Sequence, residues 1–436
     1  MSGPQVITLG CRLNAAESEA MRRLAAGEDD LVIVNSCAVT NEAVRQTRQA
    51  IRHAKRARPA ARVVVTGCAA QIEPETFAAM PEVDRVVGNR EKLLSSSFLP
   101  DEAVPAAPVR VADIMAVRET APHLASGFAE RTRAFVEVQN GCDHRCTFCI
   151  IPFGRGNSRS VPAGRVVERI KALAGEGVEE VVLTGVDVTS YGPDLPGGPS
   201  LGLLVERILR HVPTLPRLRL SSLDCIEIDA RLEAIIAGEP RFMPHLHMSF
   251  QAGDDLVLKR MKRRHSRAQA IETVQRLKAG RPGLAIGADL IAGFPTETDA
   301  MHENSLRLVE ECDIVMGHVF PFSPKRGTPA ARMPQVPPAV VKGRARRLRE
   351  ACARQRGKWL EGLVGTTQRV LVEKDGRGHA ENFAPVGLRR PGEDRGLVAA
   401  RRPYSSQGRG PRGGDGGVVE ALIVAVENDS LVGVPA

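Results

Sequence analysis

Three short apolar runs near the amino terminus each lead into a cysteine. The runs cover residues 6–9, 31–34 and 63–65, and the cysteines are Cys11, Cys37 and Cys68. Aliphatic and β-branched residues dominate the runs, as in strands buried on both faces, and helical patterns at residues 17–26 and 42–58 separate them. The cysteines are about 30 residues apart, the length of one βαβ unit. Because parallel strands end at the same edge of a sheet, this pattern predicts a parallel α/β domain in which the three cysteines converge.

Converging cysteines have two interpretations. They could simply be small buried side chains, which are common in sheets. However, each cysteine lies just past its strand, and Cys11 and Cys68 follow Gly10 and Gly67, which allow the backbone to approach a ligand closely. Thiolates are the ligands of iron–sulfur clusters. We therefore favour a three-cysteine cluster site over three structural cysteines.

A second set of cysteines has the spacing C-x3-C-x2-C. Cys142, Cys146 and Cys149 follow the apolar run at residues 135–138. Three thiolates on one loop can hold three irons of a [4Fe–4S] cluster and leave the fourth iron open to a substrate or cofactor. The alternative is zinc, whose sites usually combine a C-x2-C pair with a distant second pair. His144 lies inside the loop, where it is poorly placed to complete a tetrahedron. The spacing therefore favours an iron–sulfur cluster.

The central region alternates strand-like and helical patterns. The expected strands are residues 135–138, 180–183, 217–220, 245–250, 284–291 and 314–320. Amphipathic helical patterns lie between them, at residues 166–173, 203–211 and 268–277. Six strand–helix units are too few for a closed eight-fold barrel, so we expect an open parallel half-barrel with its active face at the carboxyl ends of the strands.

The carboxyl-terminal region predicts a small antiparallel β-barrel. Its expected strands are residues 367–373, 379–383, 418–426 and 431–434. Residues 387–417 are rich in glycine and proline, carry seven arginines and predict a flexible loop. Basic stretches at residues 259–264 and 342–358, together with a net charge of +9, favour RNA as a partner, although a charge run is commonly a solvated face.

Cysteine usage and hydropathy bear on the compartment. The chain has nine cysteines and no apolar run long enough for an export signal or a membrane span. A disulfide framework is therefore not expected, and we predict a cytoplasmic protein that does not enter a membrane. Cys225, Cys312 and Cys352 share no spacing with the other cysteines and are expected to be structural.

The order of these features resembles the methylthiotransferase family of radical S-adenosylmethionine (SAM) enzymes. Both cysteine sets occur in the family's order, and Phe148 precedes the last cysteine of the second set, as in radical SAM proteins. The resemblance implies an N-terminal parallel α/β cluster domain (residues 1–110), a radical SAM partial (β/α)6 barrel (131–360) and a TRAM-like RNA-binding β-barrel (361–436).

The resemblance also implies roles for individual residues. Cys142, Cys146 and Cys149 would hold the [4Fe–4S] cluster that binds and reductively cleaves SAM. Cys11, Cys37 and Cys68 would hold an auxiliary [4Fe–4S] cluster that carries the transferred sulfur. Two loops would contact SAM, and they contain Thr184, Gly185 and Val186 after the second strand, and Ile291, Gly293 and Glu297 after the fifth. By themselves these loops are weak signals, because a glycine after a strand is usually only a turn.

Four segments resemble one branch of the family. These are residues 8–14, 35–43, 318–324 and 378–383. This branch transfers a methylthio group to carbon 2 of N6-threonylcarbamoyladenosine at position 37 of tRNA, consuming two SAM. The expected partners are the tRNA anticodon stem-loop, a reductant protein such as a flavodoxin or ferredoxin, and a sulfur donor, and the protein is expected to be a monomer. The alternatives are the same chemistry on isopentenyladenosine or on a ribosomal-protein aspartate, or a non-catalytic iron–sulfur RNA-binding protein. The segment at 387–417 departs from the family pattern.

Overall fold

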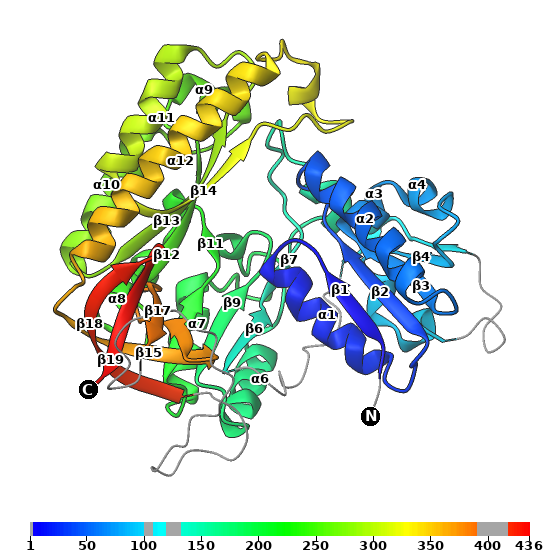
Figure 1. The fold of residues 1–436 in the computed structure, drawn as a ribbon, viewed down its shortest axis with the longest axis horizontal. Helices are drawn as coiled ribbons and strands as arrows, with labels where there is room; N and C mark the ends of the chain where they lie inside the picture. The colour runs from blue at the N-terminus through cyan, green and yellow to red at the C-terminus, as the bar shows by residue number, and fades with distance from the viewer. Residues whose placement is uncertain (1–2, 100–107, 119–131, 390–416) are drawn as a thin grey trace.

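The computed structural model describes residues 3–99, 108–118, 132–389 and 417–436. Figure 1 shows three parts in chain order: a blue to cyan sheet with its helices, a central half-barrel coloured cyan through yellow, and an orange to red barrel. Within these residues, no helix is both long and apolar enough to cross a membrane.

The N-terminal part is a five-stranded parallel sheet in the order β1-β2-β3-β4-β5. Its strands are β1 (Gln5–Thr8), β2 (Leu31–Ser36), β3 (Arg62–Gly67), β4 (Arg85–Val87) and β5 (Val109–Arg110). Its helices are α1 (Arg12–Leu24), α2 (Asn41–Ala57), α3 (Cys68–Ile72) and α4 (Pro74–Ala78), with 3₁₀ turns η1 (Glu91–Leu93), η2 (Ser95–Ser97) and η3 (Ile114–Ala116). The first three strands were predicted, whereas the short strands β4 and β5 were not.

Both faces of this sheet are covered by helices. Leu31 and Ile33 of β2 pack with Met21 of α1 on one face. Val32 of β2 packs with Ile51 of α2 on the other. Because side chains alternate along a strand, a continuous apolar run requires a cover on each side, and this explains why β2 is buried throughout.

The half-barrel contains all six predicted strands, paired in parallel. They are β6 (Arg133–Glu137), β9 (Glu180–Thr184), β10 (Arg217–Leu220), β12 (His245–Gln251), β13 (Ala285–Ala292) and β14 (Ile314–Pro321). A two-residue strand, β11 (Ser222–Leu223), follows β10 and pairs with β12, so it connects the sheet β10-β9-β6 to the sheet β11-β12-β13-β14. A small antiparallel pair, β7 (Gln139–Asn140) with β8 (Arg159–Ser160), brackets the second cysteine set.

Helices surround the half-barrel strands. They are α5 (Ile151–Arg155), α6 (Ala163–Gly175), α7 (Leu201–His211), α8 (Ala230–Gly238), α9 (Asp255–Met261), α10 (Arg267–Gly280), α11 (Asp299–Glu311) and α12 (Pro338–Glu361), with 3₁₀ turns η4 (Val188–Ser190), η5 (Cys225–Glu227) and η6 (Pro329–Arg332). Cys225, Cys312 and Cys352 are buried in the hydrophobic core between strands and helices, in agreement with the structural role expected for them. Cys352 requires a glycine opposite it, because a Cβ at Gly317 would lie 2.3 Å from its sulfur.

The C-terminal part is a closed barrel in the order β15-β16-β17-β19-β18. Its strands are β15 (Thr367–Lys374), β16 (Arg377–His379), β17 (Pro385–Leu388), β18 (Gly417–Glu427) and β19 (Ser430–Pro435). Its pairings are antiparallel apart from β17 with β19, which is parallel. The expected all-antiparallel barrel is thus corrected at this one pairing.

Two details of the predicted C-terminal region were wrong. The expected strand 379–383 ends at His379, and the chain then turns, with Phe383 N–H donating to the Ala380 carbonyl at 2.9 Å. Of the expected loop 387–417, the first two residues belong to β17 and the last begins β18. Residues 390–416 lie outside the described residues.

The C-terminal barrel packs against the amino ends of the half-barrel strands. Arg217 and Arg219 of β10 donate to the carbonyls of Arg369 and Glu381, at 3.1 and 2.8 Å. The cysteine loop follows the carboxyl end of β6, so the C-terminal barrel and the loop lie at opposite ends of the half-barrel lumen.

Candidate functional site

Cys11, Cys37 and Cys68 lie just past β1, β2 and β3, at the carboxyl edge of the N-terminal sheet. A Cβ at Gly10 would lie 3.0 Å from the Cys37 sulfur, so the chain beside Cys11 passes directly against Cys37. Gly67 has φ +94°, and a Cβ there would lie 2.4 Å from the Ser36 carbonyl oxygen. The predicted convergence is therefore seen in the structure, whereas the role of these cysteines as ligands stays a prediction.

A buried charged network supports Cys68. Arg155, the last residue of α5, donates its Nε–H to the Cys68 sulfur at 3.1 Å. Arg155 also binds Glu17 of α1, and Lys92 donates to the same carboxylate at 2.6 Å. The side chains of Glu17, Lys92 and Arg155 are at most 2% exposed. Two cations share the Glu17 carboxylate, so the network places positive charge and an N–H donor beside the Cys68 sulfur.

The second cysteine set lies on a tightly held loop. Gly141 has φ +73°, and a Cβ there would lie 1.9 Å from the Asn157 carbonyl oxygen, so only glycine fits. Cys149 N–H donates to the Cys146 carbonyl at 3.1 Å. Thr147 between them donates its hydroxyl to the Arg260 carbonyl at 2.8 Å, which attaches the loop to α9.

Charged side chains surround this loop. His144 Nε2 lies 3.0 Å from an oxygen of Asp187. Hydrogen bonds to Asp187 and Glu227 raise the pKa of His144 to about 10, so it is a cation and not a neutral metal ligand. Arg263 lies 3.8 Å from the Cys146 sulfur and binds Asp224. Arg263, in the basic stretch 259–264, thus points toward the cysteine loop and not into solvent as an RNA-binding surface would require.

The spacing of the thiols fits clusters better than a single ion. Within the described residues, none of the six cysteines belongs to a group of three or more ligand atoms that all lie within 4.8 Å of one another. Ligands of one tetrahedral zinc ion lie about 3.8 Å apart, so each set is spread wider than such an ion requires. Burial raises the pKa of Cys37 to about 11 and that of Cys149 to about 12, so metal binding would have to displace protons.

The first predicted SAM loop is fixed by Gln139 of β7. The Gln139 side-chain oxygen accepts from Val186 N–H at 3.1 Å, and a Cβ at Gly185 would lie 2.6 Å from the Gln139 carbonyl oxygen. The Thr184 carbonyl accepts from Val138 N–H at 2.9 Å. These contacts place the loop beside the cysteine loop, and its contact with SAM stays a prediction.

The second predicted SAM loop is held by Glu297. Its carboxylate accepts from Gly293 N–H at 2.9 Å and pairs with Arg344 of α12 at 3.0 Å. Ile291 belongs to a small apolar cluster against which Phe148 of the cysteine loop packs. Both SAM loops therefore adjoin the cysteine loop. The Glu297 carboxylate, however, is already bound by Gly293 N–H and Arg344.

The basic helix α12 has a narrower free surface than its sequence indicates. Four of its arginines pair with carboxylates, namely Arg344, Arg346, Arg347 and Arg356. Lys342, Arg354 and Lys358 are exposed and form no ion pair within the described residues. Arg349 is also exposed and without an ion pair in the part of the chain that the structure describes, and it donates to the Val319 carbonyl at 3.1 Å. These four cations can bind a polyanion.

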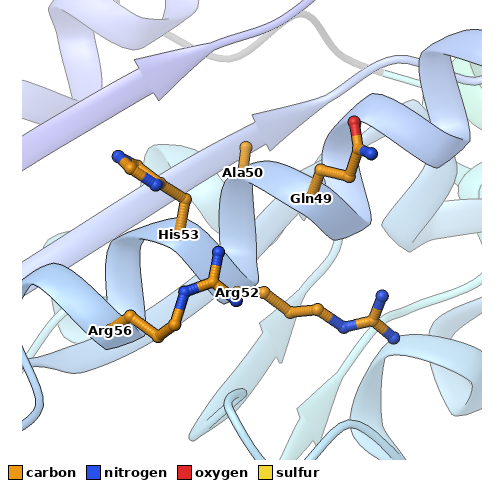
Figure 2. A pocket seen from close by; sticks show the side chains of 5 residues that line it. All are labelled: Gln49, Ala50, Arg52, His53 and Arg56. Atoms are coloured by element: carbon orange, nitrogen blue, oxygen red, sulfur yellow. The ribbon is translucent and has the colours of Figure 1, made fainter.

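A surface depression of about 560 Å³ lies on the carboxyl-terminal half of α2. Figure 2 shows the side chains that line it. Its lining residues are Gln49, Ala50, Arg52, His53 and Arg56. It contains none of the six cysteines, so it is not the cluster site.

Comparisons with known proteins agree with this arrangement. Residues 136–309 match the radical SAM superfamily, and residues 4–88 match the uncharacterized protein family UPF0004. The radical SAM methyltransferase TsrM from Kitasatospora setae has a TM-score of 0.51 at 18% identity, covering 72% of this chain and 66% of that chain, which shows a shared fold.

Curated relatives define the family. The threonylcarbamoyladenosine tRNA methylthiotransferase MtaB of Rickettsia prowazekii is 51% identical, covering 88% of this chain and 91% of that protein. The enzyme of the same name from Aquifex aeolicus is 34% identical, covering 87% and 95%. The tRNA-2-methylthio-N(6)-dimethylallyladenosine synthase of Erythrobacter litoralis is 32% identical, covering 86% and 87%. The chain therefore belongs to the radical SAM methylthiotransferase family, in the branch of the threonylcarbamoyladenosine tRNA methylthiotransferases.

Proposed function

We propose that this protein transfers a methylthio group to carbon 2 of N6-threonylcarbamoyladenosine in tRNA. The observation that carries this proposal is that one short helix, α5, connects the two cysteine sets. It begins just after Cys149 and ends at Arg155, whose guanidinium meets the Cys68 sulfur. A Cβ at Gly154 of the same helix would lie 3.2 Å from the Cys68 Cβ. Because one short helix contacts both cysteine sets, metal centres bound by the two sets would lie close enough to take part in one reaction.

The six cysteines divide into two ligand sets. Cys142, Cys146 and Cys149 would hold the SAM-binding [4Fe–4S] cluster, with the loops at residues 184–186 and 291–297 around SAM. Cys11, Cys37 and Cys68 would hold the auxiliary cluster. When bound, the clusters and SAM supply the electron, the methyl group and the sulfur for the reaction. The corresponding domains are residues 1–110, 131–360 and 361–436.

The chain's own residues orient and tune these sites. The ion pair of His144 with Asp187 fixes the cysteine loop against η4. Arg155 and Arg263 place N–H groups beside the sulfurs of Cys68 and Cys146. Hydrogen bonds and positive charge near cluster sulfurs favour the reduced, more negative cluster state and so raise its reduction potential.

Partners follow from charge and chemistry. The tRNA would bind through its anticodon stem-loop, using the C-terminal barrel and exposed cations such as Arg354 and Lys358 of α12. A flavodoxin or ferredoxin would supply electrons, and a separate donor would supply sulfur. The protein would act as a monomer in the cytoplasm.

Mass spectrometry of tRNA nucleosides tests the substrate. Cells lacking this protein should accumulate threonylcarbamoyladenosine without its 2-methylthio group. Re-expression of the Cys352→Ala protein should restore the methylthio group, because Cys352 is a buried core residue, whereas the Cys146→Ala protein should not. Loss of the methylthio group from isopentenyladenosine instead would refute the proposed substrate.

Iron content and SAM cleavage test the two-cluster assignment. Anaerobically reconstituted protein should bind about eight irons per chain, as two [4Fe–4S] clusters require. Replacing either cysteine set by alanine should leave about half. Reduced protein should cleave SAM to 5′-deoxyadenosine, and protein that binds iron without any cleavage would support the non-catalytic RNA-binding alternative.

A further inference from the structure

A group of arginines meets inside the half-barrel lumen at the ring of Phe383. Arg12 is the first residue of α1, Arg133 the first residue of β6, and Arg219 lies on β10. Their guanidinium carbons are 5.7, 5.1 and 4.9 Å from the centre of the Phe383 ring. The arginines come from the N-terminal part and the half-barrel, and the ring comes from the C-terminal part, so all three parts of the molecule meet at this cluster.

The ring at the centre of this cluster is held in place. Phe383 stacks against His245 and His379, with ring centroids 5.0 and 4.5 Å apart. Its φ of +69° lies in the left-handed region, which is unfavourable for an aromatic residue. The backbone at Phe383 is therefore strained in the conformation that places this ring in the lumen.

The carboxylates of the cluster do not balance its cations. Glu180, which is fully buried, pairs with Arg133 and Arg219, and Glu373 also pairs with Arg133. Asp289 is nearby, but its carboxylate is bound by His247 and His318, at 3.0 and 3.3 Å. Within the described residues, no carboxylate forms an ion pair with Arg12. Arg217 on β10 adds another buried cation, and Glu381, a further nearby carboxylate, pairs with Arg369. The four arginines therefore outnumber Glu180 and Glu373, the carboxylates that pair with them.

We propose that Arg12, Arg133 and Arg219 form a carboxylate-binding subsite, and that Arg12 completes it by binding the carboxylate on the N6 side group of the modified adenosine. This inference rests on the proposed function. Guanidinium groups bind carboxylates through paired hydrogen bonds, and Arg12 is half-buried, so a ligand carboxylate can reach it and bind it in a partly desolvated position. The threonylcarbamoyl group ends in a carboxylate, whereas the isopentenyl group is an uncharged hydrocarbon. The subsite would therefore set specificity between the two tRNA substrates.

The position of Arg12 fits the reaction. Arg12 directly follows Cys11 of the proposed auxiliary set. In adenine, carbon 2 and the carbon that bears N6 flank the same ring nitrogen, so a group attached to N6 lies close to carbon 2. Arg133 begins β6, which is about 13 Å long, and the cysteine loop follows beyond the other end of this strand. A nucleoside lying between them would present carbon 2 near Cys11 while its side group reaches the arginines.

Binding of three anticodon stem-loop RNAs tests the subsite. The RNAs are identical except that the target base is threonylcarbamoyladenosine, isopentenyladenosine or adenosine, and binding to reconstituted protein is measured by fluorescence anisotropy. For Arg12→Gln, the Kd of the threonylcarbamoyl RNA should rise about tenfold or more, as expected for loss of a charge-assisted hydrogen bond, and the other two Kd values should stay as in wild type. Arg354→Gln is the matched control and should weaken all three RNAs alike.

Two other results would contradict the proposal that Arg12 binds the side-group carboxylate. An equal loss for all three RNAs in Arg12→Gln would mean that Arg12 binds a backbone phosphate, and unchanged binding would mean that it binds no part of the RNA. Arg12→Lys keeps the charge without the forked geometry, so it should retain part of the preference for the threonylcarbamoyl RNA. This variant distinguishes a loss of binding from a folding defect in Arg12→Gln. Wild-type protein that methylthiolates the isopentenyl RNA instead would refute the proposed function itself, whatever Arg12 does.

Discussion

The buried network of Glu17, Lys92 and Arg155 predicts a large loss of stability when Glu17 loses its charge. Glu17→Gln keeps the side-chain volume, so no cavity term is expected. The change leaves Lys92 and Arg155 as two buried cations without a carboxylate, and their side chains are 0% and 2% exposed. Removing one partner of a buried ion pair costs about 3–5 kcal/mol. Because the glutamine oxygen can still accept one hydrogen bond, we expect about 3 kcal/mol.

Urea unfolding followed by far-ultraviolet circular dichroism at pH 7 measures this loss. Glu19→Gln is the control on the same helix, because Glu19 pairs with Arg22, whose side chain is 46% exposed, and surface pairs contribute less than about 1 kcal/mol. A Glu17→Gln protein as stable as the Glu19→Gln protein would refute the reasoning, since the network would then contribute no more than a surface pair.

The same comparison has a defined pH dependence. Burial by itself raises the pKa of Glu17, but Arg155 and then Lys92 lower it below its ordinary value. The stabilisation from Glu17 is therefore fully present above its unfolded-state pKa of about 4.3, and it is lost as the pH falls through the lowered folded-state pKa. The difference between wild type and Glu17→Gln should shrink only in that acidic range.

Two further predictions concern a buried histidine and the cysteine loop. Burial, followed by the charges of Arg347 and Arg344, lowers the pKa of His302 to about 4. The free energy of unfolding should therefore fall by about 3 kcal/mol as the pH decreases from 6.5 toward 4. In urea unfolding, His302→Leu should remove this part of the pH dependence. Gly141→Ala should halve the iron bound per chain, because the added Cβ would collide with the Asn157 carbonyl and displace the second cysteine loop. Gly164→Ala in α6 is the control, since the added Cβ would lie in open space, and it should leave the iron content unchanged.

Local sequence patterns predicted the strands and the convergence of Cys11, Cys37 and Cys68, whereas the role of the cysteines as ligands stays a prediction. The β-branched runs before Cys11, Cys37 and Cys68 specify buried parallel strands, and such strands bring their carboxyl ends together without further information. The spacing of Cys142, Cys146 and Cys149 within one loop is visible directly in the sequence. These features depend on periodicity and on short-range order, which a sequence displays directly.

The supporting side chains could not be predicted in this way. Arg155 and Glu17 meet across 138 positions of the chain, and no local spacing relates them. Charge content did not show that Arg263 points toward Cys146. Phe383 follows a segment with strand-like composition, but the Asn382 side chain accepts from Ala384 N–H at 3.1 Å and favours a turn instead. Such contacts depend on how distant elements pack.

The placement of Arg155 has a consequence for biosynthesis. Domains generally fold in order as the chain leaves the ribosome, and the N-terminal sheet with its three cysteines emerges first. Arg155 follows Cys68 by 87 positions and belongs to the next part of the chain. Until Arg155 has been synthesised, Glu17 can pair only with Lys92, and Cys68 lacks its hydrogen-bond donor. The helix α5 that completes the first cysteine set also follows directly from the second. The surroundings of the first cysteine set are therefore completed only after the second set has been synthesised, so the first metal site is not finished ahead of the second cysteine loop.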